Sequence, residues 1–435
     1  MLWAHNAEPG RVTERVRFGS GYRAFDSDTA VYAPLGEAAL FGSGIGELGQ
    51  DELDRLATGR KLGFAFAVED AVFSFTAQTR ASDVEDQLYL FAAKLGMPSW
   101  DADPVIRTKA GAQLAYKTYA TSPSGVLNRA LQYLATDKAP RFATPDPEAL
   151  ERVTPEKFRE VWEPLLQQGP VEVLVFGDYD KASLITKLSQ TFGALPARKP
   201  IPAAALARLP RFPSAETLPT VLEHRGDANQ GAAVITWKTG GGVADLRQSR
   251  KIEILSQLFN NRLLEAMREK LGASYSPQVF SKWPKDIPVG GSITAIAQLE
   301  PENIPVFFAE ADRIAKDLAA APPTADEIER VTGPLSQLIR RASTGNQFWL
   351  YNLEGASFDR RHVDLLPYVL RDFSSADPRI MQLLAERYFA QGAPFRLAII
   401  PEGTQLAEVA PLEPPKPRTQ PVRVGSPQGP GVDGR

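Results

Sequence analysis

Two side chains that donate hydrogen bonds, Arg268 and Tyr275, lie seven positions apart in the segment 260–281, NNRLLEAMREKLGASYSPQVFS. At neutral pH an arginine donates through a planar fork and a tyrosine donates through one hydroxyl, so two fixed donors suit a carbonyl or carboxylate oxygen. The structural alternative is an exposed arginine at a helix end and a half-buried tyrosine, because charges at helix ends are usually solvated. From this segment alone, the structural alternative is favoured.

The sequence around the pair predicts a helix, a stop and a strand. The apolar stripe that ends at Met267 has helical spacing. Gly272 follows two basic residues of the last turn, which is typical of a helix end. Residues 274–280 are predicted to be extended. A helix that stops and turns back into a strand would bring Arg268 and Tyr275 close together.

Composition excludes several classes of protein. The 435 residues are too many for one core, so two or three domains are expected. The formal net charge of -3 implies no electrostatic attraction to nucleic acid or an anionic membrane. No stretch reaches the ~18 apolar residues of a membrane span. There are no cysteines, which excludes disulfides, thiolate metal sites and a cysteine nucleophile without fixing the compartment.

Histidine is too sparse for a zinc site of the common kinds. The three histidines, His5, His224 and His362, are far apart, and no H-x-x-x-H or H-x-x-E-H pair exists. We interpret His224 and His362 as ordinary surface or core residues. The glycines at 240–242 lack the spacing of a phosphate loop and predict a plain strand-to-helix turn.

Localisation stays unknown from the sequence. The segment 1–12, MLWAHNAEPGRV, is too polar for a signal peptide, so this chain alone predicts a cytoplasmic protein. Export with a precursor or a partner would make it periplasmic.

Hydrophobic periodicity predicts two domains of similar size, at 10–200 and 211–410, followed by a disordered Pro-rich tail at 411–435. Hairpins and helix-separated strands together predict an α+β fold with mixed, mostly antiparallel sheets and helices on one face. In the first domain we expect a loose arm at 1–12, a short strand at 16–18, a small helix with Ala38 on its apolar face, a hairpin at 61–79, helices at 82–95, 103–119, 122–135 and 156–168, a strand at 171–176 and a helix at 181–192. Residues 193–210, rich in Pro and Ala, are predicted to be a linker. In the second domain we expect strands at 217–224 and 230–238, a helix ending at Leu271, a hairpin at 275–297, helices at 301–319, 324–342 and 375–389, and a strand at 395–400.

The two halves repeat a pattern. Segment 154–178 resembles segment 377–403: in each, a helix meets a Gly-Pro or Ala-Pro break and then an apolar strand of six residues. The offset is about one domain length, which indicates a duplicated domain rather than a solenoid.

Four stretches resemble the pitrilysin/insulinase family of zinc metallopeptidases. These are VEVLVFGDYDKASLITKLSQTFGALP at 171–196, LEAMREKLGASYS at 264–276, PPTADEIERV at 322–331 and IGELGQDELDRL at 45–56. The resemblance implies two homologous α+β domains of the LuxS/MPP-like metallopeptidase fold. It also implies that this chain corresponds to the non-catalytic, C-terminal-type half of the family.

The active half of that family carries H-x-x-E-H, in which two histidines bind zinc and the glutamate activates water. The matching place in this chain is Pro34, Glu37 and Ala38, where both histidine positions are lost. Gln113 offers at best an amide where the family has a further glutamate ligand. The resemblance therefore implies no metal in this chain, no catalytic residue within this chain alone, and zinc in a partner half. Glu37 is most simply a solvated helix residue.

The resemblance also changes the interpretation of Arg268 and Tyr275. In the family, an arginine and a tyrosine at this spacing bind the substrate carbonyl near the scissile bond from the half without zinc. Carried over, these two residues are expected to bind substrate and stabilise the oxyanion. Phe280 and Trp283, on the strand that follows, are either core residues or part of a peptide groove.

Three functions remain open at this stage. The first is the non-zinc-binding half of a zinc endopeptidase, completed by an H-x-x-E-H subunit or N-terminal half and acting on peptides. The second is a catalytically inactive structural or assembly protein of the same fold. The third is a stand-alone peptide-binding protein.

Overall fold

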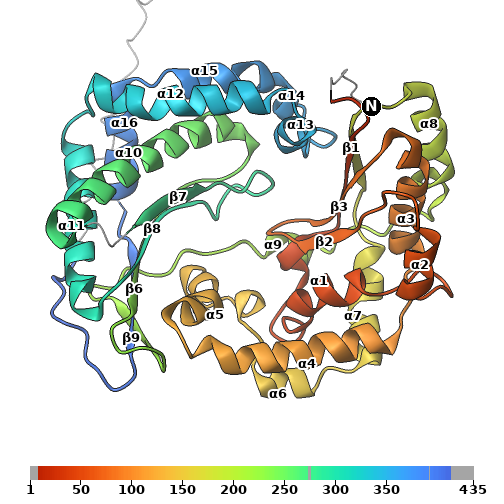
Figure 1. Ribbon diagram of the computed structural model, residues 1–435, viewed down its shortest axis with the longest axis horizontal. Coiled ribbons are helices and arrows are strands. Elements are labelled where there is room, and N and C mark those ends of the chain that lie inside the picture. Colours follow the sequence, from red (N-terminus) through yellow and green to blue (C-terminus); the bar gives the residue numbers. More distant parts are fainter. Residues whose placement is uncertain (1–7, 273–275, 391, 413–435) are drawn as a thin grey trace, which may run out of the picture.

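The computed structural model describes residues 8–272, 276–390 and 392–412. It contains two sheets, one from each half of the chain, with most helices packed around them (Figure 1). The first is a four-stranded sheet of order β2-β3-β1-β4, and the second is a five-stranded sheet of order β5-β9-β6-β8-β7. The α+β fold class predicted from the sequence is confirmed.

The first half begins with the central strand of its sheet. Its elements are β1 (Val12–Phe18), η1 (Gly21–Ala24), α1 (Tyr32–Phe41), α2 (Gln50–Leu56), β2 (Ala65–Val68), β3 (Phe73–Thr79), η2 (Ala81–Asp83), α3 (Val84–Gly96), α4 (Ala102–Tyr119), α5 (Pro123–Ala135), η3 (Pro140–Phe142), α6 (Pro147–Glu151), α7 (Pro155–Leu166), β4 (Glu172–Gly177), α8 (Lys181–Gln190), η4 (Phe192–Ala194) and α9 (Ala203–Ala207).

The second half follows the same order with one added strand. Its elements are β5 (Thr220–His224), β6 (Gly231–Lys238), η5 (Val243–Asp245), α10 (Leu246–Leu271), β7 (Gln278–Lys282), β8 (Ser292–Leu299), η6 (Pro301–Asn303), α11 (Ile304–Ala320), α12 (Ala325–Ala342), α13 (Asn346–Leu353), α14 (Arg361–Asp364), η7 (Leu366–Tyr368), α15 (Val369–Ser374), α16 (Pro378–Ala385), η8 (Glu386–Ala390) and β9 (Phe395–Pro401).

The strand orders make the internal repeat explicit. The order β2-β3-β1-β4 of the first sheet corresponds to β7-β8-β6-β9 of the second, and β5 is added beside β9 in parallel. In both sheets the hairpin strands pair antiparallel, and β4 pairs antiparallel with β1 as β9 does with β6. The two sheets are therefore two copies of one unit, and α1 occupies the same place in the chain order as α10.

Each sheet buries one face against helices of its own half. In the first half, Phe73 and Phe75 of the predicted hairpin are buried with Trp162 of α7, whose indole N–H donates to the carbonyl of Tyr32 at 3.0 Å. In the second half, Trp237 and Phe259 form the corresponding aromatic centre with ring centroids 5.3 Å apart. Burial of such large aromatic side chains dominates core energetics.

The opposite face of each sheet takes a helix from the other half. Helix α5 of the first half packs on β5, β6 and β9, and α13 of the second half packs on β1 and β4 (Figure 1). The expectation of helices on one face only is therefore wrong. Local periodicity identifies an apolar helix face but does not specify which sheet the helix covers. The packing of α5 and α13 on the sheet of the other half was therefore not predicted.

Several local expectations need correction. The first strand spans Val12–Phe18 rather than three residues, so it includes the end of the predicted arm. The predicted linker contains the helix Ala203–Ala207, anchored by the buried Ala205. Ala38 is exposed rather than buried on α1. The segment 343–374, for which we had no prediction, forms α13, α14 and α15.

No helix within the described ranges is long and apolar enough to cross a membrane. Residues 413–435, most of the predicted tail, lie outside the described residues.

Candidate functional site

Helix α1 carries Pro34, Glu37 and Ala38, the three positions that the resemblance aligns with H-x-x-E-H. Pro34 and Ala38 lie one turn apart on its exposed side, and Glu37 is half-buried between them. The opposite side of α1 packs against the core. A side-chain carbon added at Gly36 would lie 2.0 Å from the ring of Trp162, so only glycine allows this close approach. The helix is thus held by its buried side, and Pro34 and Ala38 face outward.

Glu37 has a structural partner. Its Oε1 accepts the backbone N–H of Val68, the last residue of β2, at 2.7 Å. Burial raises the pKa of Glu37, the hydrogen bond from Val68 opposes the rise, and the charge of Glu69 adds to it. Glu37 therefore ties α1 to the end of β2, a role other than the solvated residue expected from the sequence.

The donor set at this position does not fit zinc. A proline and an alanine offer no side-chain ligand atom, and the one carboxylate left is bonded to the backbone. No group of three or more His, Cys, Asp or Glu side chains suited to a metal occurs among the described residues.

Arg268 lies on the last turns of α10 and is exposed. Its neighbours on the same helix are engaged. Arg262 forms a two-pronged ion pair with Glu327 of α12, at 2.7 and 3.2 Å, and Lys270 pairs with Glu310 of α11 at 2.5 Å. The guanidinium of Arg268 makes no ion pair or hydrogen bond to any of the described residues. Among these three cations, Arg268 is the one that faces solvent without a structural role.

The second predicted residue, Tyr275, lies outside the described residues. The ends of the segment that contains it are well defined. Helix α10 ends at Leu271 and is capped by Gly272, which has a φ of 84° and donates its N–H to the carbonyl of Arg268 at 3.0 Å. The strand that follows is tied back to the same helix, because Asn260 accepts the N–H of Val279 at 2.9 Å. Both ends of the segment are therefore fixed to α10.

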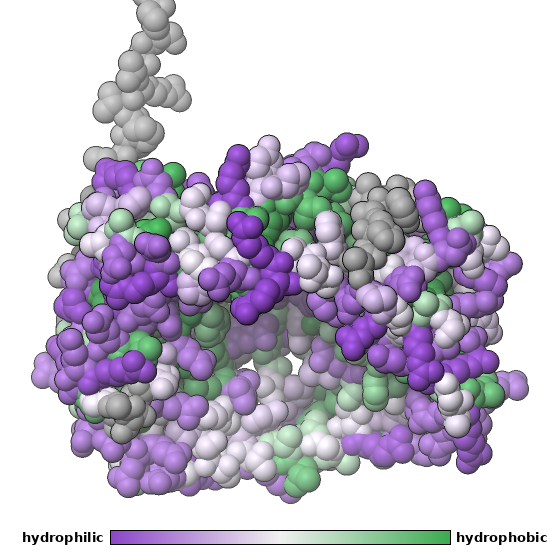
Figure 2. Space-filling view, turned by 45° about the horizontal axis from the view of Figure 1, so that its top comes forward, coloured by the Kyte–Doolittle hydropathy of each residue, from purple (hydrophilic) through white to green (hydrophobic). Residues whose placement is uncertain are grey.

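A cavity of about 450 Å³ lies between the two halves. It is lined by the turn between β2 and β3, by the turn between β7 and β8, and by residues of α5 and α13. Its walls combine aromatic and charged side chains, which include Tyr22, Asp70, Gln132, Lys282, Trp283 and Tyr351. Figure 2 shows the molecule hollowed at its centre, with many hydrophilic side chains around the opening. Trp283 thus reaches a cavity, and Phe280 is 46% exposed on the edge strand.

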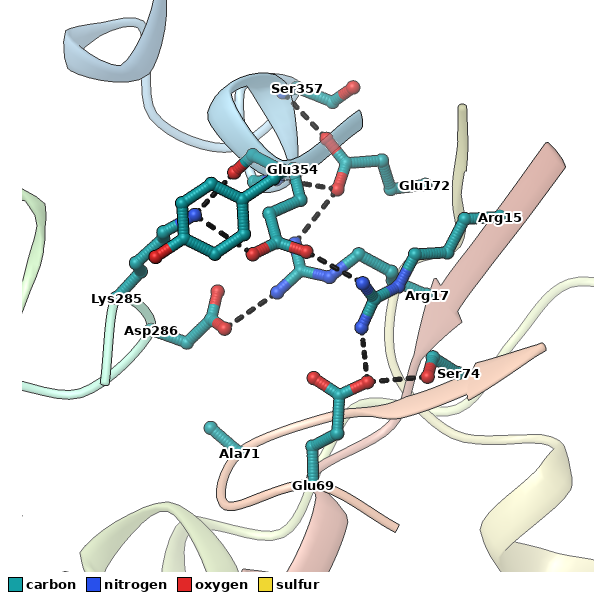
Figure 3. A network of polar contacts seen from close by, with 12 residues as sticks. Arg15, Arg17, Glu69, Ala71, Ser74, Glu172, Lys285, Asp286, Glu354 and Ser357 are labelled. Carbon is teal, nitrogen blue, oxygen red and sulfur yellow. Dashed lines mark hydrogen bonds and ion pairs between the residues drawn. The ribbon is translucent and has the colours of Figure 1, made fainter. Parts of the chain in front are cut away.

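A network of ion pairs crosses from one half to the other beside this cavity (Figure 3). Arg17 on β1 pairs with Glu172 of β4 at 2.9 Å and with Asp286 of the β7–β8 turn at 2.6 Å. Arg15 pairs with Glu354, just after α13, at 2.8 Å and also with Glu69. These contacts join residues 339 positions apart in sequence and fix the first sheet against the second half.

The backbone after α13 completes the network. The backbone N–H groups of Gly355 and Ser357 donate to the carboxylate of Glu172 at 2.8 and 2.9 Å. Burial alone would lower the pKa of Arg17, but Asp286 and Glu172 outweigh this effect and raise it. The side chains of Arg17 and Glu172 are only 1% and 0% exposed. Removal of either one would leave the other as a buried charge without its counter-ion, which is far more costly than at the surface.

The network was not predicted from the sequence. Arg15 and Arg17 alternate with apolar residues on a strand, which usually indicates a solvated face. The feature that could have indicated the network is the presence of two arginines, Arg15 and Arg17, on a central strand of the sheet. The histidines agree with our interpretation: His224 and His362 are buried, and His224 accepts the N–H of Gly226 at 3.0 Å.

Comparison with known proteins supports the resemblance. Residues 152–333 match the model of a family described as the peptidase M16 inactive domain. The match begins at the end of the first half, includes all of α10 and ends within α12. A search of curated protein sequences finds no match.

Solved structures with this fold include bacterial peptidases. The periplasmic protease PqqL from Escherichia coli is 14% identical with a TM-score of 0.76, over 92% of this chain and 44% of PqqL. A peptidase M16 inactive domain from Pseudomonas fluorescens is 16% identical with a TM-score of 0.75, over 92% of this chain and 96% of that one. A protease from Helicobacter pylori is 17% identical with a TM-score of 0.76, over 91% and 96%. At these identities the likeness shows the fold, and the chain spans less than half of PqqL.

Proposed function

We propose that this chain is the non-zinc-binding half of a pitrilysin/insulinase-type endopeptidase, because residues 152–333 match the model of the peptidase M16 inactive domain. In this proposal the zinc is held by an H-x-x-E-H partner, either a separate subunit or the N-terminal half of a longer protein. This chain supplies part of the peptide groove and the pair Arg268 and Tyr275.

The unengaged state of Arg268 is the observation that carries the proposal. The flanking cations Arg262 and Lys270 both form ion pairs that hold α10 to other helices. Arg268 lies between them, faces solvent and makes no such contact to the described residues. The ion pairs of Arg262 and Lys270 hold the end of α10 in place. The backbone that carries Arg268 therefore loses little conformational entropy when the guanidinium binds a ligand.

The chemistry assigned to this chain is binding and charge stabilisation. A fork of N–H donors aimed at the substrate carbonyl strengthens its bonds as negative charge develops on that oxygen, and one such donor typically contributes about 3–4 kcal/mol to a transition state. Zinc in the partner would supply the Lewis acid and the activated water. No residue of this chain takes part in that step.

The proposal is tested in the assembled enzyme. Arg268→Ala is expected to lower kcat for peptide hydrolysis by about 100-fold while the zinc content per partner stays unchanged. Tyr275→Phe is expected to reduce turnover in the same direction. Arg330→Ala is the matched control, because Arg330 is also exposed on a helix but forms an i,i+4 pair with Asp326. Unchanged hydrolysis in both the Arg268 and Tyr275 variants would contradict the proposal.

A structural or assembly protein of the same fold is the second candidate. The observation that favours it is the rigid, buried ion-pair network, which fixes the halves without any chemistry. A scaffold has no need of an unengaged Arg268. Assembly that tolerates Arg268→Ala and shows no peptide hydrolysis with any H-x-x-E-H partner would favour the scaffold.

A further inference from the structure

His362 is a buried histidine beside the ion-pair network that joins the two halves. It lies on α14 and is 3% exposed. A side-chain carbon added at Gly355 would lie 2.9 Å from its Nε2 and 3.4 Å from Nη1 of Arg17. The imidazole and the guanidinium of Arg17 therefore flank the same backbone position, with no side chain between them at Gly355.

The backbone that this imidazole packs against also holds Glu172. The N–H of Gly355 donates to Glu172 at 2.8 Å, and that carboxylate pairs with Arg17 at 2.9 Å. The preceding residue, Glu354, pairs with Arg15 of β1 at 2.8 Å (Figure 3). The short segment after α13 thus carries contacts of the second half to the first sheet, and a displaced imidazole would disturb it directly.

The site of His362 fits the neutral form of the ring. Its Nδ1 is buried and makes no hydrogen bond to any of the described residues. A charged imidazole donates from both ring nitrogens, and at Nδ1 it would find no acceptor there. A buried charge without a partner is costly, so protonation favours a position of the ring that water can reach.

The charges around His362 do not favour its protonation. Burial is the main cause that lowers the pKa of His362, and the charge of Lys285 lowers it further. The carboxylates of Asp286 and Asp359 act in the opposite direction, and the charge of Arg17 adds to the lowering. Both carboxylates are already engaged by arginines, at 2.6 and 2.5 Å. The elements packed around the ring carry further titratable groups, which are Asp245 on η5, Tyr368 on η7, Tyr351 on α13, Glu354 just after α13, and Arg361 and Asp364 on α14.

We propose that His362 makes the contact between the two halves sensitive to acid. With a neutral imidazole, segment 354–357 stays bonded to Glu172 and the halves keep their alignment at the cavity. With a protonated imidazole, the ring leaves its site beside Arg17, the segment loses its hydrogen bonds to Glu172, and α13 moves away from the first sheet. The inference goes beyond the proposed function, because it concerns the alignment within this chain and holds with or without a peptidase partner.

The direction of the pH dependence follows from the burial of the ring. The folded state holds the proton of His362 less tightly than the unfolded state, in which the histidine pKa is about 6.5. The contact is therefore fully formed above about pH 6.5, and it weakens as the pH falls through the lower pKa of the folded state.

Amide hydrogen exchange at segment 354–357 of the full chain tests the proposal. Between about pH 7.5 and about pH 5, with rates corrected for intrinsic exchange, the protection of this segment is expected to fall by about tenfold, because its opening is coupled to the uptake of one proton. His362→Gln and His362→Phe cannot take up that proton and are expected to keep their protection within about twofold. His224→Gln is the matched control and should respond as the parent protein does, because His224 is 1% exposed but both of its ring nitrogens are partnered.

Equal protection of the segment at both pH values would overturn the inference, as would a loss of protection that persists in both His362 variants. A loss that extends to β6, at the centre of the second sheet, would mean that acid unfolds the whole chain and would also overturn it. If neither variant folds, the parent protein decides, since the midpoint of the change in exchange must coincide with the titration of the His362 ring followed by NMR. A different midpoint would contradict the assignment to His362.

Discussion

The two sheets of this protein are covered in opposite ways by the helices they exchange. Helix α5 covers the second sheet through aliphatic residues, in which Val126 and Leu127 pack on Val234 and Leu397. Helix α13 occupies the equivalent place on the first sheet, where Arg15 and Arg17 of β1 meet Glu172 and Glu354. The α5 contact is thus aliphatic, whereas the α13 contact adds buried ion pairs to the buried side chains of Leu350 and Leu353.

The two contacts differ in how strictly they fix the relative positions of the elements they join. Apolar burial is non-directional and tolerates small shifts, whereas paired charges require defined positions. The charged side is the one beside the cavity and the β7–β8 turn. We infer that the aliphatic contact holds the halves together and that the ion pairs set the alignment of the cavity walls.

The largest expected effect comes from breaking the buried pair. Arg17→Leu leaves Glu172 and Asp286 without their cation and should lower the free energy of unfolding by about 3–5 kcal/mol. Denaturant unfolding measures it. Arg159→Gln is the control, because Arg159 forms an exposed i,i+4 pair with Glu163 and should change stability by less than about 0.5 kcal/mol. Equal effects of the two variants would contradict the distinction.

The aliphatic contact should respond differently to salt. Leu127→Ala removes a 6%-exposed side chain from the α5 contact and should destabilise the protein by about 2–3 kcal/mol. Because the lost interaction is apolar, the difference from the parent protein should be the same at low and high ionic strength. A difference that shrinks with added salt would show that charges also hold this side.

Glu14 gives a pH-dependent comparison between the halves. It is 0% exposed on β1 with both carboxylate oxygens unpartnered, and the equivalent position on β6 is Ala233. Burial raises the pKa of Glu14 well above its usual value. The folded state therefore holds this proton more tightly than the unfolded state, and stability falls as pH rises above about 4, the usual glutamate pKa.

Glu14→Leu should remove that loss. We expect the variant to be more stable than the parent protein by about 1–2 kcal/mol at pH 8, with a smaller difference at pH 4. Melting temperatures across this range measure it. A difference that does not change with pH would mean that Glu14 finds a partner in the folded protein.

The smallest effect is expected at the rim of the cavity. Lys282 and Asp70 pair at 2.6 Å between the two hairpin turns, with side chains 48% and 20% exposed. Lys282→Met should reduce stability by less than about 1 kcal/mol, and the effect should disappear in high salt. A larger loss in the free energy of unfolding would show that this pair contributes to stability as the buried ion pairs do.

Local pattern was sufficient for the repeated unit. Alternation in the β2–β3 hairpin and the capping box at Thr324 each predicted an element that the structure contains. The strand orders confirm that the two halves repeat. That Pro34 and Ala38 carry no metal-ligating side chain depends only on residue type, and their correspondence to the histidines of H-x-x-E-H stays a prediction.

Contacts between the two halves could not be predicted from the sequence. The charges of Arg15 and Arg17 alternate as on a solvated strand, and only the placement of α13 turns them inward. The sequence also did not predict that Arg141 is buried with its Nε and Nη2 unpartnered, because this depends on how segments distant in sequence pack around it. Such information lies in nonlocal packing, which local periodicity does not contain.

The most direct test of the central claim is to measure zinc and peptide hydrolysis for this chain, for an H-x-x-E-H partner and for their mixture. We predict that zinc follows the partner alone, that neither component hydrolyses peptide efficiently by itself, and that the mixture does. Stoichiometric zinc in this chain alone, or hydrolysis by the partner that this chain does not increase, would contradict the account.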